Sequence, residues 1–198
     1  MGFLDALLGR TKPVQADLDH LFALPGARIT LEASEGLRPT GNAGVCFKPA
    51  AGQAFDAATK EIGDLLRLDE SGAQATVGLD EKADEYGYHW VVVNAADFDT
   101  LVTRVHFVNS TLQDHGYGPQ LLCSVFGFAP GTDGASAGPA TTYLVYLFKR
   151  GTFYPFVPIG GERRDNEAEL RLKEELATDL AIESDLDHWF PIWSLPVR

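Results

Sequence analysis

The feature that most constrains the fold is a series of apolar segments whose spacing alternates between strand and helix patterns. Two of them, 121–128 and 142–148, are rich in β-branched and aromatic residues and predict the strongest strands of the chain. From Gly44 onward the expected order is strand, helix, strand, strand, helix, strand, strand, helix. Helices on one face of a largely antiparallel sheet bury all these apolar faces. We therefore predict an α+β fold: a two-layer sandwich with a mostly antiparallel sheet, helices on one face, and short N-terminal helices.

The remaining elements follow from the same periodicities and from capping residues. Asp97 and Asp165 are expected to cap the helices that they begin, and Pro25-Gly26 is expected to end the helix at 15–24. A strand at 152–156 is placed at the sheet edge, where Pro155 is tolerated, and the apolar tail at 189–193 is expected to pack on the core. The other predicted strands are 28–33, 44–48, 74–79 and 86–93, and the predicted helices are 15–24, 52–67, 97–115 and 165–180.

The length of the chain, 198 residues, fits one α+β domain over residues 1–198. An apolar content of 45% is sufficient for a hydrophobic core. Within this domain we distinguish an N-terminal helical segment, 1–25, and a flexible hairpin insert, 129–140, rich in glycine and proline. No interdomain linker is evident.

The charge balance excludes several classes of function. Sixteen basic and 28 acidic residues give a net charge of −12, which argues against nucleic-acid binding and against broad electrostatic docking on an anionic bilayer. No apolar stretch approaches the ~20 residues of a membrane span, and no signal peptide is apparent, so we expect a cytoplasmic protein. Phe3, Leu4, Leu7 and Leu8 share one helical face. They allow peripheral contact with the inner face of the membrane as an alternative to packing on the domain.

No pattern predicts a reaction, a metal or a cofactor. Cys46 and Cys123 each lie in an apolar run without a CxxC partner, which indicates two buried, reduced thiols. The five histidines lack metal-binding spacing, and the serines lack a nucleophile elbow. We therefore expect no catalytic residues, and the absence of an enzymatic site is the favoured interpretation.

One segment, 149–166, gathers basic and aromatic side chains in an otherwise acidic chain. Such a surface usually serves recognition. The residues predicted to face outward and bind a partner are Lys149, Arg150, Phe153, Tyr154, Phe156, Arg163 and Arg164. The alternative is structural: the rings belong to the core and the arginines pair with local acids such as Glu162 and Asp165. A third possibility is a small anion held near Arg163 and Arg164 at the start of the last helix.

Several longer stretches resemble one family. They are Gly2-Phe3-Leu4 with Leu7-Leu8-Gly9-Arg10, then Val108–Leu112, Gly116–Cys123, Tyr146–Phe156, Glu162–Asn166 and Trp189–Trp193. Together they resemble the actinobacterial PspA-associated protein PspAB, over nearly the whole chain and most specifically in its second half. The 130–139 insert looks longer than the hairpin usual in that family.

The resemblance implies an accessory role in the phage-shock envelope-stress response, in which PspA is a coiled-coil protein that remodels membranes. A PspA-like coiled coil, or the HtpX-like membrane metallopeptidase encoded in the same neighbourhoods, is the partner it implies. We expect a non-enzymatic adaptor that binds a partner protein through the 148–166 surface. The alternatives are a small-molecule-binding protein or enzyme that holds an anion at Arg163/Arg164, and a protein-binding module resembling secretion chaperones.

Overall fold

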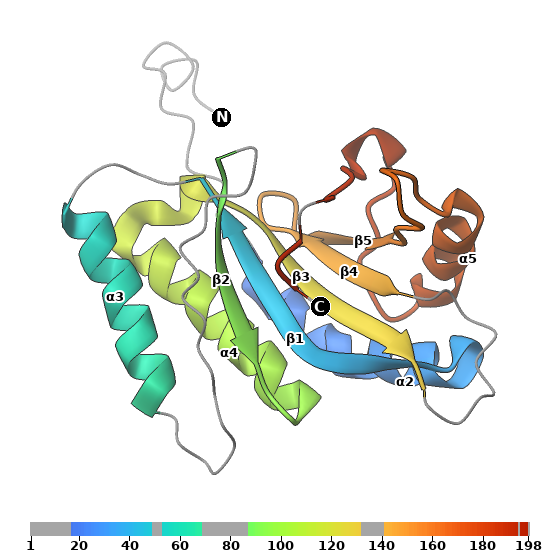
Figure 1. The fold of residues 1–198 in the computed structure, drawn as a ribbon, viewed down its shortest axis with the longest axis horizontal. Coiled ribbons are helices and arrows are strands. Elements are labelled where there is room, and N and C mark those ends of the chain that lie inside the picture. The colour runs from blue at the N-terminus through green and yellow to red at the C-terminus, as the bar shows by residue number, and fades with distance from the viewer. Residues whose placement is uncertain (1–16, 49–52, 69–86, 132–140, 194, 198) are drawn as a thin grey trace, which may run out of the picture.

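The computed structural model describes residues 17–48, 53–68, 87–131, 141–193 and 195–197. Within these ranges the chain forms a five-stranded antiparallel sheet and four α-helices (Figure 1). The predicted α+β fold is thereby confirmed. The strands are β1 (Leu37–Phe47), β2 (His89–Asn94), β3 (Leu121–Pro130), β4 (Thr142–Leu147) and β5 (Thr152–Phe156).

The sheet has the spatial order β2-β1-β3-β4-β5. Its two longest strands, β1 and β3, are neighbours in the interior of the sheet. A register shift lies between Cys46 and Phe47 where β1 pairs with β3. A short turn at Gly151, whose φ is +67°, joins β4 to β5. Glycine adopts this left-handed conformation without the steric cost that a Cβ would add.

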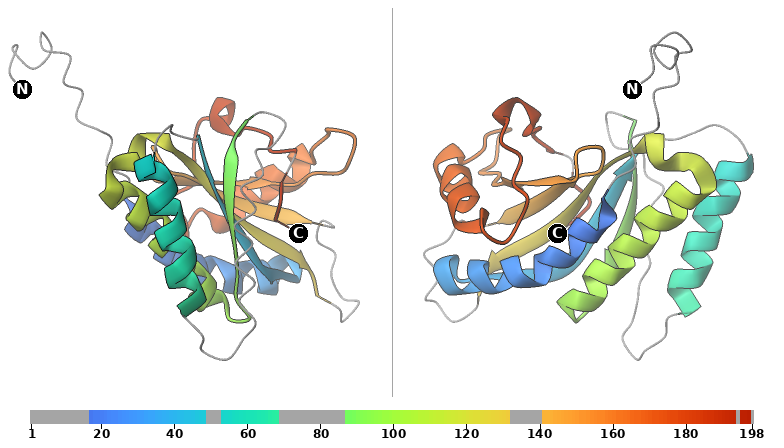
Figure 2. Two further views of the ribbon diagram at one scale, coloured as in Figure 1. Left: turned by 60° about the vertical axis from the view of Figure 1, so that its left-hand side comes forward. Right: turned by 180° about the vertical axis from the view of Figure 1, so that it is seen from behind.

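The helices lie on one face of the sheet, as the view from behind shows (Figure 2). The 3₁₀ helix η1 (Leu18–Ala23), α2 (Leu24–Glu35) and α4 (Phe98–Leu112) share one buried cluster with the strands, while α3 (Gln53–Leu68) packs beside α4. The last helix, α5 (Asn166–Leu176), packs against β5 and α2 and adds Leu172 and Leu176 to the same cluster. The sheet and helices thus enclose the main core.

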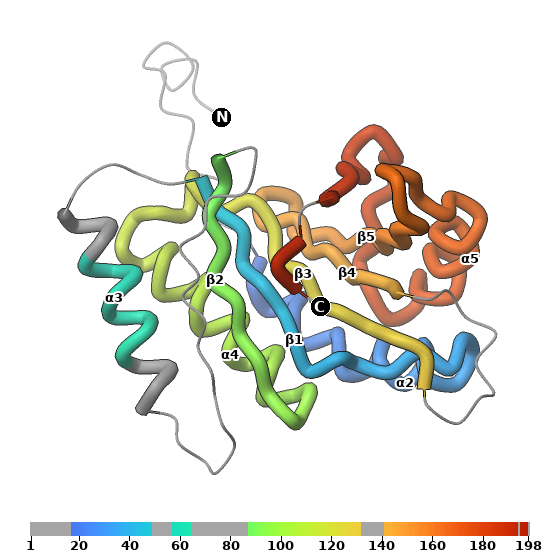
Figure 3. The backbone as a smooth tube through the Cα atoms, in the orientation of Figure 1, coloured from blue at the N-terminus to red at the C-terminus, as the bar shows by residue number. Residues whose placement is uncertain are grey.

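The opposite face of the sheet is covered differently. Beyond α5 the chain returns to β5, where Ile182 bridges to Phe153 in parallel, and then crosses in front of the sheet (Figure 3). We call residues 183–197 the C-terminal strap, of which residue 194 lies outside the described part. Strap residues Trp189 and Val197 are buried in a second cluster with Val125, Val145 and other residues of this face. The predicted packing of the apolar tail on the core is confirmed.

One region of the prediction was wrong. The chain does not end a helix at Pro25-Gly26 and begin a strand at 28–33; instead α2 runs through both. Proline is tolerated in the first turn of a helix, where its missing N–H has no intrahelical partner to lose. Leu24, Ala27 and Leu31 are buried at helical spacing, whereas Ile29, which a strand would place on the same face as Leu31, is exposed.

Most other elements agree with prediction. The helix at 52–67 is α3, the strands at 121–128, 142–148 and 152–156 are β3, β4 and β5, and the strand at 44–48 is the end of a longer β1. The Asp97 and Asp165 carboxylates accept hydrogen bonds from the backbone N–H groups of Thr100 and Ala168, as N-caps do. The predicted strand at 74–79, the apolar face at Phe3–Leu8 and most of the 129–140 insert lie outside the described residues.

Candidate binding pocket

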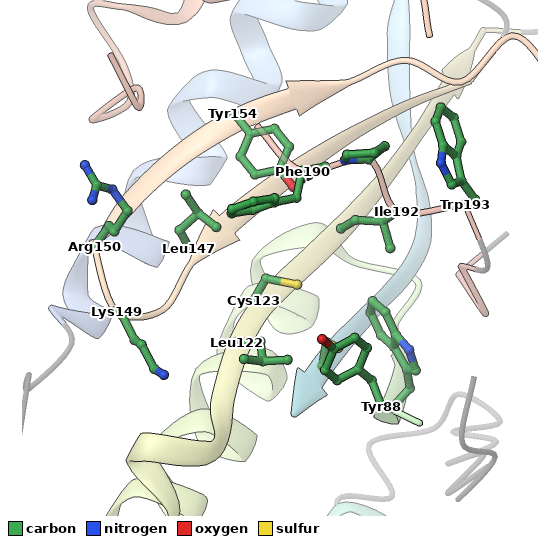
Figure 4. A pocket seen from close by; sticks show the side chains of 13 residues that line it. Tyr88, Leu122, Cys123, Leu147, Lys149, Arg150, Tyr154, Phe190, Ile192 and Trp193 are labelled. Carbon is green, nitrogen blue, oxygen red and sulfur yellow. Dashed lines mark hydrogen bonds between the residues drawn. The ribbon is translucent and has the colours of Figure 1, made fainter. Parts of the chain in front are cut away.

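A pocket of about 520 Å³ opens on the face of the sheet that carries the C-terminal strap (Figure 4). Its floor comes from the sheet, its opposite wall from the strap, and its rim from the β4–β5 turn. Figure 4 shows Lys149 and Arg150 at one end, with Tyr88 and Trp193 toward the other. The lining residues are Cys46, Tyr88, Trp90, Leu122, Cys123, Leu147, Lys149, Arg150, Tyr154, Phe190, Pro191, Ile192 and Trp193.

The floor is apolar because side chains alternate along each strand, and this face is buried in its own right. Leu147 and Tyr154 belong to the second cluster, on the strap side of the sheet, which we call the front cluster. Leu144 and Phe153, on the same strands, point to the helix layer. Cys46 and Cys123 are 4% and 9% exposed, which confirms their predicted burial, and no disulfide joins these two residues in the structure. A floor of this kind favours an apolar ligand.

The strap is held in place by specific hydrogen bonds. The Tyr154 hydroxyl donates to the Phe190 carbonyl oxygen at 2.7 Å, and the Trp189 indole N–H donates to the Glu183 carbonyl oxygen at 3.0 Å. The Arg164 Nη1 group donates to the Trp189 carbonyl oxygen at 2.7 Å. Burial raises the pKa of the Tyr154 hydroxyl, so it stays neutral and able to donate. These contacts fix the strap backbone while leaving the Phe190 ring 56% exposed at the rim.

The strap begins at a buried carboxylate. Glu183 pairs with the Arg150 guanidinium and also accepts hydrogen bonds from the Thr152 hydroxyl at 2.8 Å and the Asp185 N–H at 3.0 Å. The Arg150 hydrogen bond is the main reason that the pKa of Glu183 falls to about 2. Arg150 is therefore neutralised within the molecule.

Lys149 differs from its neighbour. Its side chain is exposed, and it forms no ion pair or hydrogen bond with another residue in the described part of the chain. Lys149 thus gives the pocket rim a cationic group that is available to a ligand.

The predicted outward orientation of the three rings is wrong. Phe153, Tyr154 and Phe156 are all at most 1% exposed. Phe153 contacts Tyr146 in the helix-side core, with 5.0 Å between ring centroids, and Phe156 lies beneath Trp193 of the strap at 5.3 Å. Tyr154 alone of these three reaches the pocket floor. The edge of β5 is covered because residues 181–183 hydrogen-bond to Phe153, and the strap covers the outer face.

The two later arginines do not form a joint anion site. The Arg164 Nε group donates to both Glu169 oxygens at 2.9 and 2.7 Å, and the guanidinium lies over the Phe156 ring. Burial raises the pKa of Glu169 even though Arg164 and the Val157 N–H favour its charged form. Arg163 is exposed in the loop before α5. Of the seven predicted partner-binding residues, only Lys149, Arg150 and Tyr154 come together, and they do so in the pocket.

The pocket offers an apolar floor, two buried cysteines and a cationic rim. Among the described residues, no three His, Cys, Asp or Glu side chains are arranged to hold a metal ion. No helix in the described ranges is long and apolar enough to cross a membrane.

Sequence reasoning missed most of the pocket. The omitted lining residues of the sheet are Cys46, Trp90, Leu122, Cys123 and Leu147, with Tyr88 just before β2, and those of the strap are Phe190–Trp193. For the strap residues, the signal in the sequence was the aromatic content of the tail at 189–193, which predicts packing on the core. Its path across the front of the sheet was not predictable from spacing.

Comparison with known proteins places the chain in one family. No curated protein and no solved structure matches it significantly. The model of the family described as PspA associated protein B matches residues 1–197, practically the whole chain, and this protein therefore belongs to that family.

Proposed function

We propose that this protein is a non-enzymatic adaptor of a phage-shock-type envelope stress response, and that its pocket receives an apolar segment of a partner protein. Membership of a PspA-associated family supports the link to PspA. The observation that carries the binding role is the open apolar pocket beside Lys149, which pairs with no other residue in the described ranges. The role is confined to the pocket rather than to the whole 148–166 surface, because Phe153 and Phe156 are buried away from it.

The partner segment is an amphipathic helix of a PspA-like coiled coil. Such a helix presents apolar side chains at i, i+3, i+4 and i+7, which docking grooves accept as anchors. Coiled-coil helices also carry charged residues beside the apolar seam. An acidic residue there would lie next to Lys149, while the apolar anchors would contact Phe190 and the floor around Leu147 and Cys123.

The experiment compares two exposed apolar residues. Phe190→Asp places a charge at the pocket rim, and Ile159→Asp places the same charge on an exposed residue that does not line the pocket. We expect Phe190→Asp to weaken binding of the PspA-like protein from the same cell at least tenfold by isothermal titration calorimetry, a loss of about 1.4 kcal/mol. Ile159→Asp should change the affinity by less than about twofold, since isolated surface substitutions are nearly neutral.

Equal affinities for the two variants and the unaltered protein would overturn the proposal. The HtpX-like metallopeptidase is titrated in the same assay as the alternative partner. Laurate, an apolar chain with one carboxylate, is titrated as a small-molecule probe. If laurate binds and neither protein does, the pocket serves a small amphiphile instead, and the adaptor role is refuted.

A further inference from the structure

The two cysteines of the chain face each other across a pair of strands. The antiparallel register of β1 and β3 makes Cys46 and Cys123 direct partners. Both belong to the front cluster and both line the pocket, so their side chains leave the sheet on the same face. They are also the only two cysteines in all 198 residues.

This placement is close to what a disulfide requires. Directly opposed residues of an antiparallel pair have Cβ atoms about 4.5–5.5 Å apart, and a disulfide needs about 3.5–4.5 Å. The remaining adjustment is small, and it falls where the β1–β3 register shifts between Cys46 and Phe47. Strands bend and twist more readily at such irregularities than in a regular ladder.

We propose that Cys46 and Cys123 form a reversible disulfide across the pocket floor when a hydroperoxide enters the pocket. The Cys123 thiolate attacks the terminal oxygen of the peroxide, which breaks the O–O bond, gives a sulfenic acid and releases water or an alcohol. The Cys46 sulfur then attacks the Cys123 sulfur, forming the S–S bond and releasing water. Two electrons and two protons pass from the thiols to the peroxide.

The pocket supplies the access that such chemistry needs. Cysteines packed in solid apolar surroundings are unreactive, but these two lie on the wall of a cavity that opens to solvent. A bond between directly opposed strands departs from relaxed disulfide geometry, which makes it easier to reduce. The site therefore has the character of a labile, regulatory disulfide, and the bond would change the floor on which a ligand rests.

Intact-mass spectrometry of the native full-length protein tests this directly. After treatment with hydrogen peroxide we expect a monomer that has lost two hydrogen atoms, that iodoacetamide no longer alkylates, and that dithiothreitol returns to its original mass. Protease digestion should yield one cross-linked peptide joining Cys46 to Cys123. Cys46→Ala and Cys123→Ala should each abolish the two-hydrogen loss.

Three results would overturn the proposal: two alkylatable thiols after oxidation, products that have gained oxygen atoms, or disulfide-linked dimers. Circular dichroism checks that each variant is folded. Should an alanine variant fail to fold, the cross-linked peptide from the unaltered protein decides the question. None of these readouts depends on the adaptor role.

Discussion

The two faces of the sheet are both buried, but by different elements, and the pocket lies on the face that carries the C-terminal strap. Helices cover the back face, and their apolar stripes fill it with residues such as Leu144 and Val105, which are fully buried. An extended strap covers the front face, and a single extended segment is too narrow to shield the width of a five-stranded sheet. An apolar sheet face that is covered by an extended strap, and not by a layer of helices, keeps part of its surface accessible for binding.

The largest effect is expected from equal truncations on the two faces of β4. Leu144 points into the helix-side core, and Leu147 lines the pocket. Leu144→Ala should cost about 4 kcal/mol of unfolding free energy, because it creates a new cavity in a closed core. Leu147→Ala should cost about 2 kcal/mol, since part of its surroundings is already open. Urea unfolding measures both values, and equal losses would contradict the distinction between the faces.

The next largest effect concerns the origin of the strap. The Arg150 hydrogen bond lowers the pKa of Glu183 to about 2 from 4.5. A lowered folded-state pKa gives stability that is present above pH 4.5 and is lost as the pH falls toward about 2. Glu183→Gln should cost about 2–3 kcal/mol at pH 7, less than a fully buried pair because Arg150 is half-exposed.

The free energy of unfolding, measured between pH 2 and pH 7, checks the sign of this effect. It should vary less with pH in Glu183→Gln than in the unaltered protein. Glu174→Gln, at an exposed carboxylate of α5, is the matched control. Identical pH profiles for Glu183→Gln and the unaltered protein would show that Glu183 does not anchor the strap.

A smaller effect is expected from adding a methyl group to glycines on the two sides of the sheet. A Cβ at Gly44 would lie 2.8 Å from the Val197 Cγ2 atom of the strap and 3.1 Å from the Trp90 ring, so these side chains must shift. Gly44→Ala should cost about 1–2 kcal/mol. A Cβ at Gly26 in α2 meets nothing within 4 Å, and Gly26→Ala should stabilise by about 0.5 kcal/mol. Thermal unfolding compares them, and a neutral Gly44→Ala would mean that the strap is not closely packed there.

The smallest effect concerns two tyrosine hydroxyls. Tyr154 donates to the Phe190 carbonyl in front of the sheet, and Tyr146 donates to the Asp17 carbonyl behind it. Tyr154→Phe and Tyr146→Phe should each cost about 1 kcal/mol. Hydrogen exchange should rise over 189–193 in Tyr154→Phe alone. Unchanged exchange in that segment would indicate that the hydroxyl does not hold the strap.

The parts of the fold that sequence predicted are those governed by local chemistry. The periodic apolar faces of α3 and α4 and the caps at Asp97 and Asp165 depend on neighbours within a few residues. The prediction at 28–33 failed because Pro25-Gly26 is compatible with either a helix end or a helix start. The burial of Leu24, Ala27 and Leu31 at helical spacing, which distinguishes the two, depends on tertiary packing.

The binding site was less predictable because it depends on contacts between distant segments. Arg150 was recognised as a cation, but its neutralisation by Glu183 requires the chain to return past β5. The local sequence allows Phe156 to be exposed on an edge strand, and it is the Trp193 ring, from the distant strap, that covers it. Spacing within one strand indicates which residues share a face, and it does not indicate which segment covers that face.

The return of the chain at residues 181–183 has a consequence for self-association. Backbone bonds between Phe153 and this segment occupy the outer side of β5, and Pro155 removes a further donor from the same strand. Exposed strand edges are the templates on which sheets of separate molecules join. Detachment of residues 181–197 would expose the edge of β5 and the apolar front face of the sheet together, so its loss should make the protein prone to aggregation.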